Sequence, residues 1–460
     1  MDAISWLPDE VLGNILSLLP TKEAASTCIL SKKWRYVYRL VDHLEFDDSL
    51  SLYPASDEQV FPESFERFVD RTLALQSDSP IKKLSLNCHI GEGNERLQAC
   101  VGRWISNVAG RGVLEAEIRI NRRGLRSLPP QLFSCTTLVK LTIGRQIYIA
   151  RPPSYVSLPS LKFLFLDTAP FPLRYLSGVL LPGCPVLEEL SVHQKGYVVT
   201  PRTISSRIVK RLSVNYDCFH EVEDHISMSF DLPKLVCLDY SDFALAKYKL
   251  VNLESLVEAK LDLRPIKRLY LPRPDVTDLI VGIRHVEILH LSPVSAQMID
   301  SYCRGGLPLF DNLLTLSFGS KNDQGWKLLP KLLKQSPKLQ TLIVQDLDGY
   351  TSHVSMPRNK VESLHICGYR GTAQELNQLK SFLGEFEYLE FVQVDVAEAT
   401  GITMQARTDL MTLVKVLSRM YWCEAVKPEL GELLEQQTEC WNTKDVQLNK
   451  LHLEHFNDVS

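Results

Sequence analysis

The sequence predicts an α/β chain in which a small helical unit precedes an irregular repeat solenoid with a parallel sheet and a C-terminal cap. Three observations support this fold class. Apolar side chains recur at helical spacing within the first fifty residues, between proline and hydroxyl-bearing helix boundaries. An apolar-x-x-apolar-x-apolar pattern then returns roughly every 22 to 28 residues, the range of leucine-rich repeats. A pattern of strand, glycine turn, helix and strand closes the series.

The N-terminal residues predict three short helices. Pro8 suits the first turn of the first helix, and Asp9 and Glu10 place negative charge at the positive end of its dipole. Thr21 and Ser31 are expected to cap the second and third helices. A unit this small does not bury much apolar surface by itself, so part of its apolar stripe should face the rest of the chain or another protein. The stripe consists of Val11, Leu12, Ile15, Leu16 and Leu19.

Each repeat predicts one short strand and a return segment, and the repeats stack into a parallel sheet over a leucine-rich core. The segments that begin at Glu115 and Glu258 fit this pattern only partly. Because side chains alternate along a strand, every second position should face outward on the concave side of the sheet. Aromatic and arginine side chains are enriched among binding hot spots, so we expect a protein substrate on this side. The candidate contacts are Phe163, Phe165, Glu189, His193 and Arg211.

Composition narrows the function classes. The 460 residues are 45% hydrophobic and 23% charged, with a formal net charge of −4 and no concentrated basic patch. This argues against nucleic acid or a membrane surface as the partner. The sequence contains no recognisable signal peptide and no apolar run of about 20 residues. Eleven singly scattered cysteines favour a reducing compartment, so we expect an intracellular protein of the nucleus or cytoplasm that is not secreted.

Catalytic and cofactor motifs are absent from the sequence. It holds no phosphate-binding glycine loop, no Gly-x-Ser-x-Gly elbow and no His-Glu-x-x-His pair. His285 and His290 flank one strand at a spacing of five, which places them on opposite faces. We therefore expect no catalytic residue, no metal and no cofactor, and a protein that is not an enzyme.

The N-terminal motifs resemble the F-box of plant F-box proteins. They are Leu7-Pro8-Asp9-Glu10-Val11-Leu12, Leu19-Pro20-Thr21-Lys22 and Leu30-Ser31-Lys32-Lys33-Trp34-Arg35. The resemblance implies a module that docks on a Skp-family adaptor and, through it, on a cullin. Carried over by position, the docking surface would contain Leu7, Pro8, Glu10, Val11, Leu12, Ile15 and Leu16, with Leu30 and Trp34 completing it or holding the helices together.

A C-terminal segment, residues 357–396, resembles the FBD region that often follows leucine-rich repeats in plant F-box proteins. Its motifs are Val361-Glu362-Ser363-Leu364-His365-Ile366, Gly368-Tyr369-Arg370-Gly371 and Leu389-Glu390-Phe391-Val392. We divide the chain into an F-box (1–48), a connecting region with the first repeats (49–125), leucine-rich repeats (126–350), an FBD-like region or terminal repeat (351–400) and a C-terminal helical tail (401–460).

Two functions of different classes follow from these features. In the first, the chain is the substrate-recognition subunit of a Skp–cullin–F-box ubiquitin ligase, which holds an unidentified protein substrate near the loaded ubiquitin carrier. In the second, it is a leucine-rich interaction scaffold that binds partners without delivering ubiquitin. The intact motif from Leu7 to Trp34 favours the first, since no charge or helix breaker interrupts its apolar stripe.

Overall fold

The structure is a computed structural model that describes residues 3–48, 63–76, 79–89, 95–120, 128–147, 153–168, 175–195, 202–217, 227–265, 273–345, 347, 349–351 and 354–396. The chain divides into two compact units, one of residues 1–370 and 377–398 and the other of residues 371–376 and 399–460. The N-terminal helices and all the strands belong to the first unit. The predicted C-terminal helical tail lies outside the described residues.

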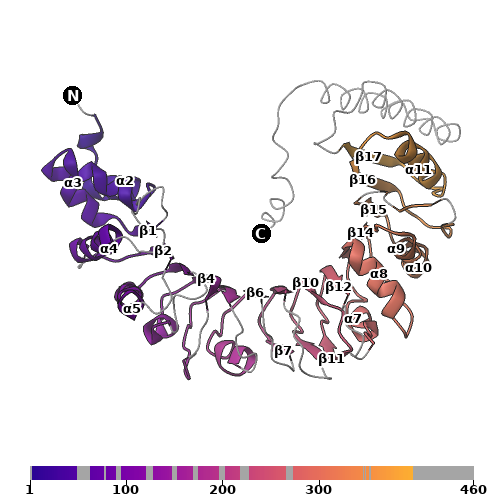
Figure 1. Ribbon diagram of the computed structural model, residues 1–460, viewed down its shortest axis with the longest axis horizontal. Coiled ribbons are helices and arrows are strands. Elements are labelled where there is room, and N and C mark those ends of the chain that lie inside the picture. Colours follow the sequence, from indigo (N-terminus) through magenta and orange to yellow (C-terminus); the bar gives the residue numbers. More distant parts are fainter. Residues whose placement is uncertain are drawn as a thin grey trace. The chain divides into compact units, whose positions relative to one another are not determined.

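The N-terminal unit contains three short α-helices, and 3₁₀ helices precede the first, follow the second and follow the third (Figure 1). The prediction that Ser31 caps the third helix is confirmed, because its hydroxyl accepts a hydrogen bond from the Trp34 N–H at 3.4 Å. The prediction for Thr21 was wrong. Pro20 is the residue before the second helix, and the Thr21 hydroxyl instead accepts a hydrogen bond from Glu45 N–H at 2.6 Å. The elements are η1 (Ala3–Trp6), α1 (Asp9–Leu16), α2 (Thr21–Ser26), η2 (Thr27–Ile29), α3 (Lys32–Val37) and η3 (Tyr38–Leu40).

A 14-stranded parallel sheet follows within the described residues (Figure 1). Its strands, in spatial order, are β1 (His43–Asp47), β2 (Lys83–Cys88), β3 (Glu115–Ile120), β4 (Lys140–Ile147), β5 (Phe163–Thr168), β6 (Glu189–Lys195), β8 (Arg211–Asp217), β10 (Cys237–Phe243), β12 (Glu258–Arg264), β13 (Ile288–Leu291), β14 (Thr315–Phe318), β15 (Thr341–Val344), β16 (Ser363–Tyr369) and β17 (Phe391–Val396). The predicted parallel sheet is confirmed.

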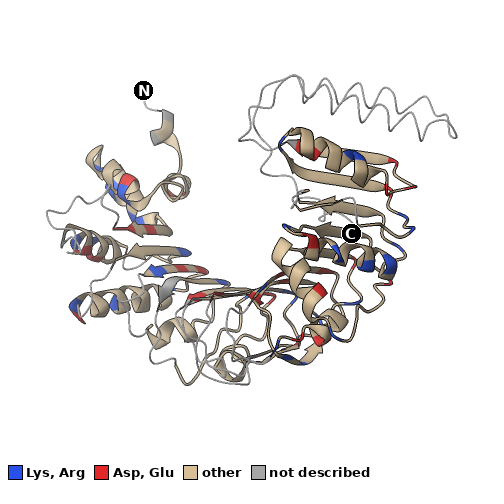
Figure 2. Ribbon diagram, turned by 45° about the vertical axis from the view of Figure 1, so that its right-hand side comes forward, with Lys and Arg blue, Asp and Glu red and all other residues tan. Residues whose placement is uncertain are grey.

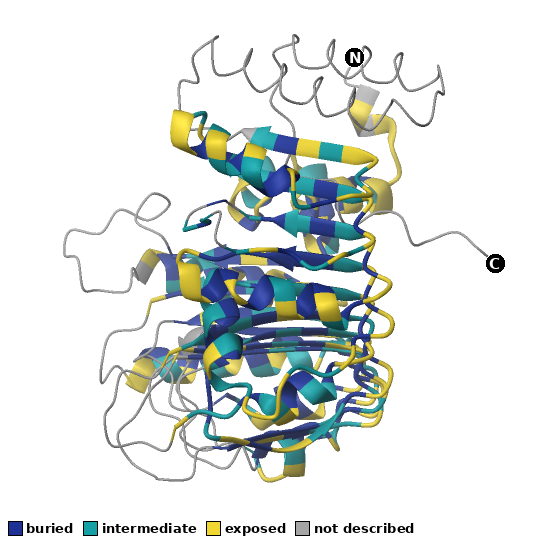
Figure 3. Cartoon of the chain, turned by 90° about the vertical axis from the view of Figure 1, so that its right-hand side faces the viewer, coloured by how far each residue is buried: buried dark blue, intermediate teal, exposed yellow. Residues whose placement is uncertain are grey.

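The register stacks the apolar positions of successive strands. Leu141 pairs with Leu164, Leu164 with Leu190, and Leu190 with Leu212, and all four are buried. Figure 3 shows the alternation of buried and less buried positions along the strands. One face of the sheet therefore forms the continuous core, and its opposite face, called the sheet face below, remains open to solvent.

The sheet extends further than the sequence pattern indicated. The segments at Glu115 and Glu258, which fit the repeat only partly, form the complete strands β3 and β12. In each strand the glutamate is the first residue and lies on the open side, so the charge does not enter the core. Strand β1 was also missed, although it directly follows the N-terminal helices and pairs with β2.

The return segments carry helices and, in the middle of the chain, a second small parallel sheet. This three-stranded sheet, β7 (Arg202–Ser205), β9 (Ser227–Asp231) and β11 (Lys247–Asn252), has the order β11-β9-β7. Phe230 of β9 packs edge-on against Tyr240 of β10 at 5.2 Å between ring centroids, which joins the two sheets. The helices are α4 (Glu63–Leu75), α5 (Glu95–Ala109), η4 (Pro130–Ser134), η5 (Leu176–Leu180), α7 (Thr277–Gly282), α8 (Pro293–Tyr302), α9 (Asp323–Trp326), α10 (Leu328–Gln335) and α11 (Ala373–Leu383).

The last described elements follow the predicted order of strand, helix and strand, as β16, α11 and β17. Phe382 of α11 packs edge-on against Tyr350 at 5.2 Å and Trp326 at 5.8 Å. These three rings are buried, so they supply apolar cover at this end of the sheet.

Candidate functional site

The N-terminal helices expose a concentrated set of apolar side chains. Ten of the twenty exposed large apolar side chains among the described residues lie between Ile4 and Tyr36. Trp6, Leu18 and Ile29 are each at least 80% exposed. We call nine of these ten side chains, all except Tyr36, the N-terminal apolar face: Ile4, Trp6, Leu7, Val11, Ile15, Leu18, Leu19, Ile29 and Leu30. A small unit gains nothing in its own stability from such exposure, so the face indicates a surface for another protein.

The residues predicted for adaptor docking separate into two sets. The first is exposed and belongs to, or borders, the N-terminal apolar face: Leu7, Pro8, Glu10, Val11, Ile15 and Leu30. Leu12 and Leu16 form the second set, since both are buried against the chain itself, and Trp34 is half-buried. The helical geometry of α1 explains why these two sets differ in exposure, because Leu12 and Leu16 each lie about 100° around the helix from the residue before them.

Sequence reasoning missed Trp6, Leu18 and Ile29 as exposed members of the face. Trp6 lies in η1 before the first predicted helix, and Leu18 follows the end of α1. A local signal was present for Ile29, because it follows Ala25 at helical spacing. Only the packing decides whether such a side is covered.

Close packing and one hydrogen-bond chain fix the buried side of α1. A side chain at Gly13 would place its Cβ 2.8 Å from Leu40 Cβ, so only glycine permits this approach of α1 to η3. Ser17 Oγ donates to the Gly13 carbonyl at 2.9 Å and accepts from Asp42 N–H at 3.2 Å. These contacts connect α1 to Asp42, the residue that directly precedes β1.

Asp42 joins the helical unit to β2. Its carboxylate contacts Lys82 Nζ at 2.7 Å, and its carbonyl accepts the backbone N–H groups of Lys82 and Lys83. Burial by itself would raise the pKa of Asp42, but the hydrogen bond and the positive charge of Lys82 help to hold the pKa below its usual value. The carboxylate therefore stays charged at physiological pH.

Helix α4 contacts both the N-terminal unit and the next repeat. Thr72 Oγ1 lies 3.1 Å from Tyr38 Oη, and Gln76 Nε2 donates to the carbonyls of Tyr38 and Val41. Arg111 donates to the carbonyls of Leu73 and Gln76 from the other side. The end of α4 thus ties the N-terminal helices to the segment that precedes β3.

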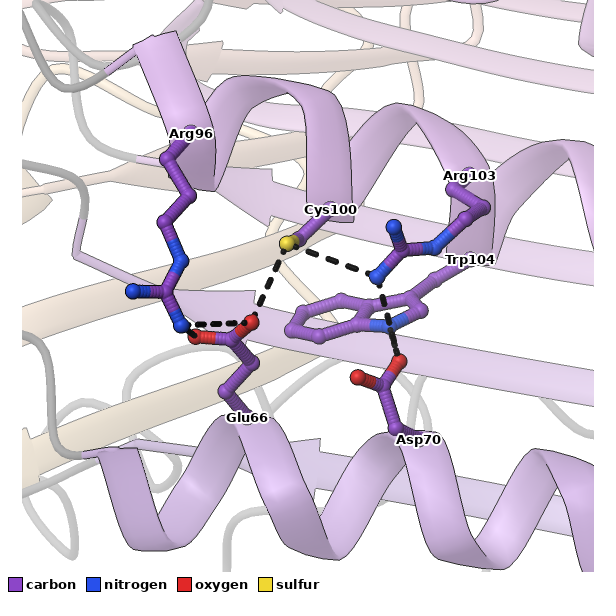
Figure 4. A network of polar contacts seen from close by, with 6 residues as sticks. All are labelled: Glu66, Asp70, Arg96, Cys100, Arg103 and Trp104. Atoms are coloured by element: carbon purple, nitrogen blue, oxygen red, sulfur yellow. Dashed lines mark hydrogen bonds and ion pairs between the residues drawn. The ribbon is translucent and has the colours of Figure 1, made fainter.

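Polar contacts between α4 and α5 extend this connection (Figure 4). Arg96 forms a two-oxygen hydrogen-bonded ion pair with Glu66, at 3.0 and 3.2 Å. Asp70 Oδ1 accepts from the buried Trp104 indole N–H at 2.7 Å and from the exposed Arg103 at 3.4 Å. We call Glu66, Asp70, Arg96, Cys100, Arg103 and Trp104 the α4–α5 brace.

The five predicted substrate contacts lie on three neighbouring strands of the sheet face. Phe163 of β5, Glu189 of β6 and Arg211 of β8 share one register row. Arg211 forms an ion pair with Glu189 at 2.8 Å, and this contact raises the pKa of Arg211 further above its usual value. His193 packs edge-on against Phe165, with ring centroids 4.9 Å apart. The structure therefore brings all five together in one surface.

Charged residues continue along β10 and β12, with both signs on β12. Figure 2 colours the charged residues of the chain by sign. A shallow depression of about 380 Å³ lies over β6, β8, β10 and β12, with Glu189, Arg211, Asp239, Glu258 and Lys260 among its lining residues. Cys237 also lines it. Burial raises the pKa of the Cys237 thiol and Glu258 adds to the effect, so the thiol is neutral. Because the segment at Glu258 fits the repeat only partly, the sequence did not predict that Glu258 and Lys260 line this depression.

None of the described helices combines the length and the apolar character needed to cross a membrane.

Two family models match the chain. Residues 4–37 match the model described as F-box domain, and residues 101–242 match the model described as FBD-associated F-box protein At5g56370, LRR repeats. The chain is 62% identical to F-box/LRR-repeat protein At3g60040 of Arabidopsis thaliana over 428 residues, 90% of this chain and 95% of that protein. It is 57% identical over 399 residues to F-box/LRR-repeat protein At1g06630 of the same plant, covering 86% of this chain and 97% of that protein.

Proposed function

The chain belongs to the plant F-box/LRR-repeat protein family, and we propose from this premise that it is the substrate-recognition subunit of a Skp–cullin–F-box ubiquitin ligase. In this role it is a non-catalytic adaptor. The N-terminal apolar face binds a Skp-family adaptor, which binds a cullin, and the sheet face binds the protein substrate. The eight described cysteines are all free thiols, which fits a reducing setting in the nucleus or cytoplasm.

The observation that carries the proposal is the N-terminal apolar face. Leu7, Val11, Ile15 and Leu30 present it, with Pro8 and Glu10 at its border, whereas Leu12 and Leu16 hold the helix from the buried side. Trp34, which lies in α3, is half-buried. A face with exposed aromatic and aliphatic anchors and a polar border has the composition of a protein-binding surface.

The connection from this face to the repeats supports delivery of a substrate to a fixed place. Asp42, α4 and the α4–α5 brace link the N-terminal helices to the first strands through paired polar groups. A ligase of this class accelerates transfer by holding the substrate near the ubiquitin carrier, and positioning of this kind requires a stiff connection. We propose that the domain division 1–48, 49–125, 126–350, 351–400 and 401–460 follows this arrangement.

Protein is the substrate class that the sheet face suits. Phe163 and Phe165 offer aromatic surface, while Glu189, His193 and Arg211 offer hydrogen bonds and charges of both signs. Nucleic acid would call for a predominantly basic surface, whereas the depression beside these residues also contains Asp239 and Glu258.

Adaptor binding tests the proposal. The intact full chain is compared with a Leu7→Ala/Pro8→Ala variant in a pull-down with a purified Skp-family adaptor. Leu309→Ala is the matched control, because Leu309 is also an exposed leucine but lies in a distant repeat. We expect the intact chain and the control to bind and the double variant to lose binding. No binding by a folded intact chain would leave the scaffold function.

Substrate capture is tested separately. Proteins that associate with the intact chain are compared with those of a Phe165→Ala/Arg211→Ala variant and of Thr341→Ala, which changes the same sheet face at β15. A substrate bound as proposed is lost with the first variant and kept with the second, while adaptor binding is unchanged in both. Equal retention in the two variants would place the substrate elsewhere.

A further inference from the structure

Two neighbouring strands place a histidine, a cysteine and an aspartate together at the C-terminal end of the sheet face. His365 and Cys367 occupy alternate positions of β16, so both side chains point to the same side. Asp395 lies on β17, one residue after Val394, which is the partner of Ile366. One ligand atom from each of the three residues lies within 4.8 Å of the other two.

A local irregularity of β16 directly follows Cys367. The register between β16 and β17 shifts between Ile366 and Tyr369, and Gly368 has a φ of 72°. A positive φ is accessible to glycine without strain, and the extra residue returns Tyr369 to the core, where it is buried. Cys367 remains half-exposed beside His365.

The three side chains have the chemistry and nearly the spacing of a zinc site. Zinc binds sulfur at about 2.3 Å and nitrogen or oxygen at about 2.0 Å in a tetrahedron, which separates sulfur from nitrogen by about 3.5 Å and nitrogen from oxygen by about 3.3 Å. His365 Nε2 lies 3.8 Å from Cys367 Sγ and 2.6 Å from Asp395 Oδ2. The histidine–aspartate pair must therefore open by about 0.7 Å to admit the ion.

We propose that His365, Cys367 and Asp395 bind a zinc ion that joins β16 to β17 and leaves a fourth coordination position open. Gln393 Nε2 donates to Asp395 Oδ1 at 3.0 Å, which orients the carboxylate as an outer partner of a metal ligand does. The side chains of His365 and Asp395 are 27% and 49% exposed, so the ion has a path of entry and the open position faces solvent.

Without a metal ion, His365, Cys367 and Asp395 contact one another, and zinc must replace these contacts. His365 Nε2 contacts both Asp395 Oδ2 and Cys367 Sγ. Zinc binding replaces the short contact and releases the thiol proton to solvent, as it does for other cysteine ligands. The sequence positions of His365, Cys367 and Asp395 do not form a familiar zinc motif, because only the pairing of β16 with β17 brings Asp395 close to the other two residues.

Zinc affinity of the full chain tests the site, measured by competition with a chromophoric chelator. Cys367→Ser and Asp395→Asn each remove one ligand, and both variants are first checked for an unchanged circular dichroism spectrum. Cys237→Ser is the matched control, because Cys237 is also half-buried on the sheet face beside a carboxylate, Glu258. We expect one zinc ion per intact chain and an affinity at least about tenfold lower in each ligand variant, with no change in the control.

Cobalt provides a second readout that depends on geometry. Co²⁺ bound to the intact chain should show the thiolate charge-transfer absorption and the intense visible bands of a tetrahedral site, and Cys367→Ser should lose the charge-transfer absorption. Equal zinc affinity of the intact chain and both ligand variants, or an equal loss in Cys237→Ser, would overturn the proposal. A cobalt spectrum without a Cys367-dependent band would overturn it as well.

Discussion

Asp70 offers a direct test of how the N-terminal unit is connected to the repeats. Its Oδ1 atom accepts a hydrogen bond from Trp104, whose side chain is 2% exposed, and another from Arg103 at the surface. Asp70→Ala removes these two of the contacts between α4 and α5, whereas Asp70→Asn keeps an oxygen acceptor in the same place. Arg103→Ala removes the surface contact with Asp70 and a contact of 3.5 Å with Cys100 Sγ of the same helix, but leaves the Trp104 hydrogen bond in place.

The magnitudes of the two contacts differ. A buried donor that loses a charged acceptor costs about 1.5–3 kcal/mol, and Trp104 N–H would lose this acceptor at 2.7 Å. The ion pair with Arg103 is exposed on both sides, so its loss costs less than about 1 kcal/mol. We therefore expect Asp70→Ala to destabilise the α4–α5 contact by about 2 kcal/mol, or about 30-fold in its opening equilibrium.

Native-state hydrogen exchange of the α4 and α5 amides measures this opening. The account predicts exchange about 30-fold faster in Asp70→Ala, with changes of about fivefold or less in Asp70→Asn and Arg103→Ala. Exchange in Asp70→Ala within a factor of about two of the intact chain would refute the reasoning, as would an equally large effect of Arg103→Ala.

Three further predictions follow from the N-terminal unit. Leu30→Ala should weaken adaptor binding about tenfold, measured by titration calorimetry, without a change in the unfolding midpoint. Leu12→Ala removes a fully buried side chain and should lower the free energy of unfolding, measured by denaturant titration, by about 2–5 kcal/mol. The pKa of Asp42 is lowered in the folded state, so its contribution to stability is full above the unfolded-state pKa of about 3.9 and is lost as the pH falls through the folded-state pKa. Asp42→Asn should therefore lose less stability at acid pH than the intact chain. Urea unfolding midpoints measured against pH show this difference. Gly13→Ala should destabilise the unit by about 1–3 kcal/mol in thermal unfolding, because the new methyl group meets Leu40; an unchanged midpoint would contradict the close packing.

Patterns among neighbouring residues correctly predicted which strand side chains are buried and which residue caps α3. Alternation assigned Leu164 and Leu166 to the core and Phe163 and Phe165 to the open side, and the burial of all four agrees. The Ser31 cap followed from its position before a helix. In each case the sequence neighbours alone decide the conformation.

Features that depend on contacts between distant segments escaped prediction. The apolar stripe of α1 does not reveal that Leu12 is buried while Val11 is exposed, because α1 packs against α3 and η3, which lie farther along the chain. The three-stranded sheet of β7, β9 and β11 arises from pairing between return segments of successive repeats. Asp395 likewise approaches Cys367 only through the register of two strands.

Assembly with a cullin tests the central claim most directly. The full chain, a purified Skp-family adaptor and the adaptor-binding part of a cullin are mixed, and size-exclusion chromatography with light scattering gives the mass of the complex. The account predicts a single 1:1:1 complex that the Leu7→Ala/Pro8→Ala variant does not form and the Leu309→Ala control does. A folded intact chain that elutes apart from an adaptor–cullin complex would contradict the account.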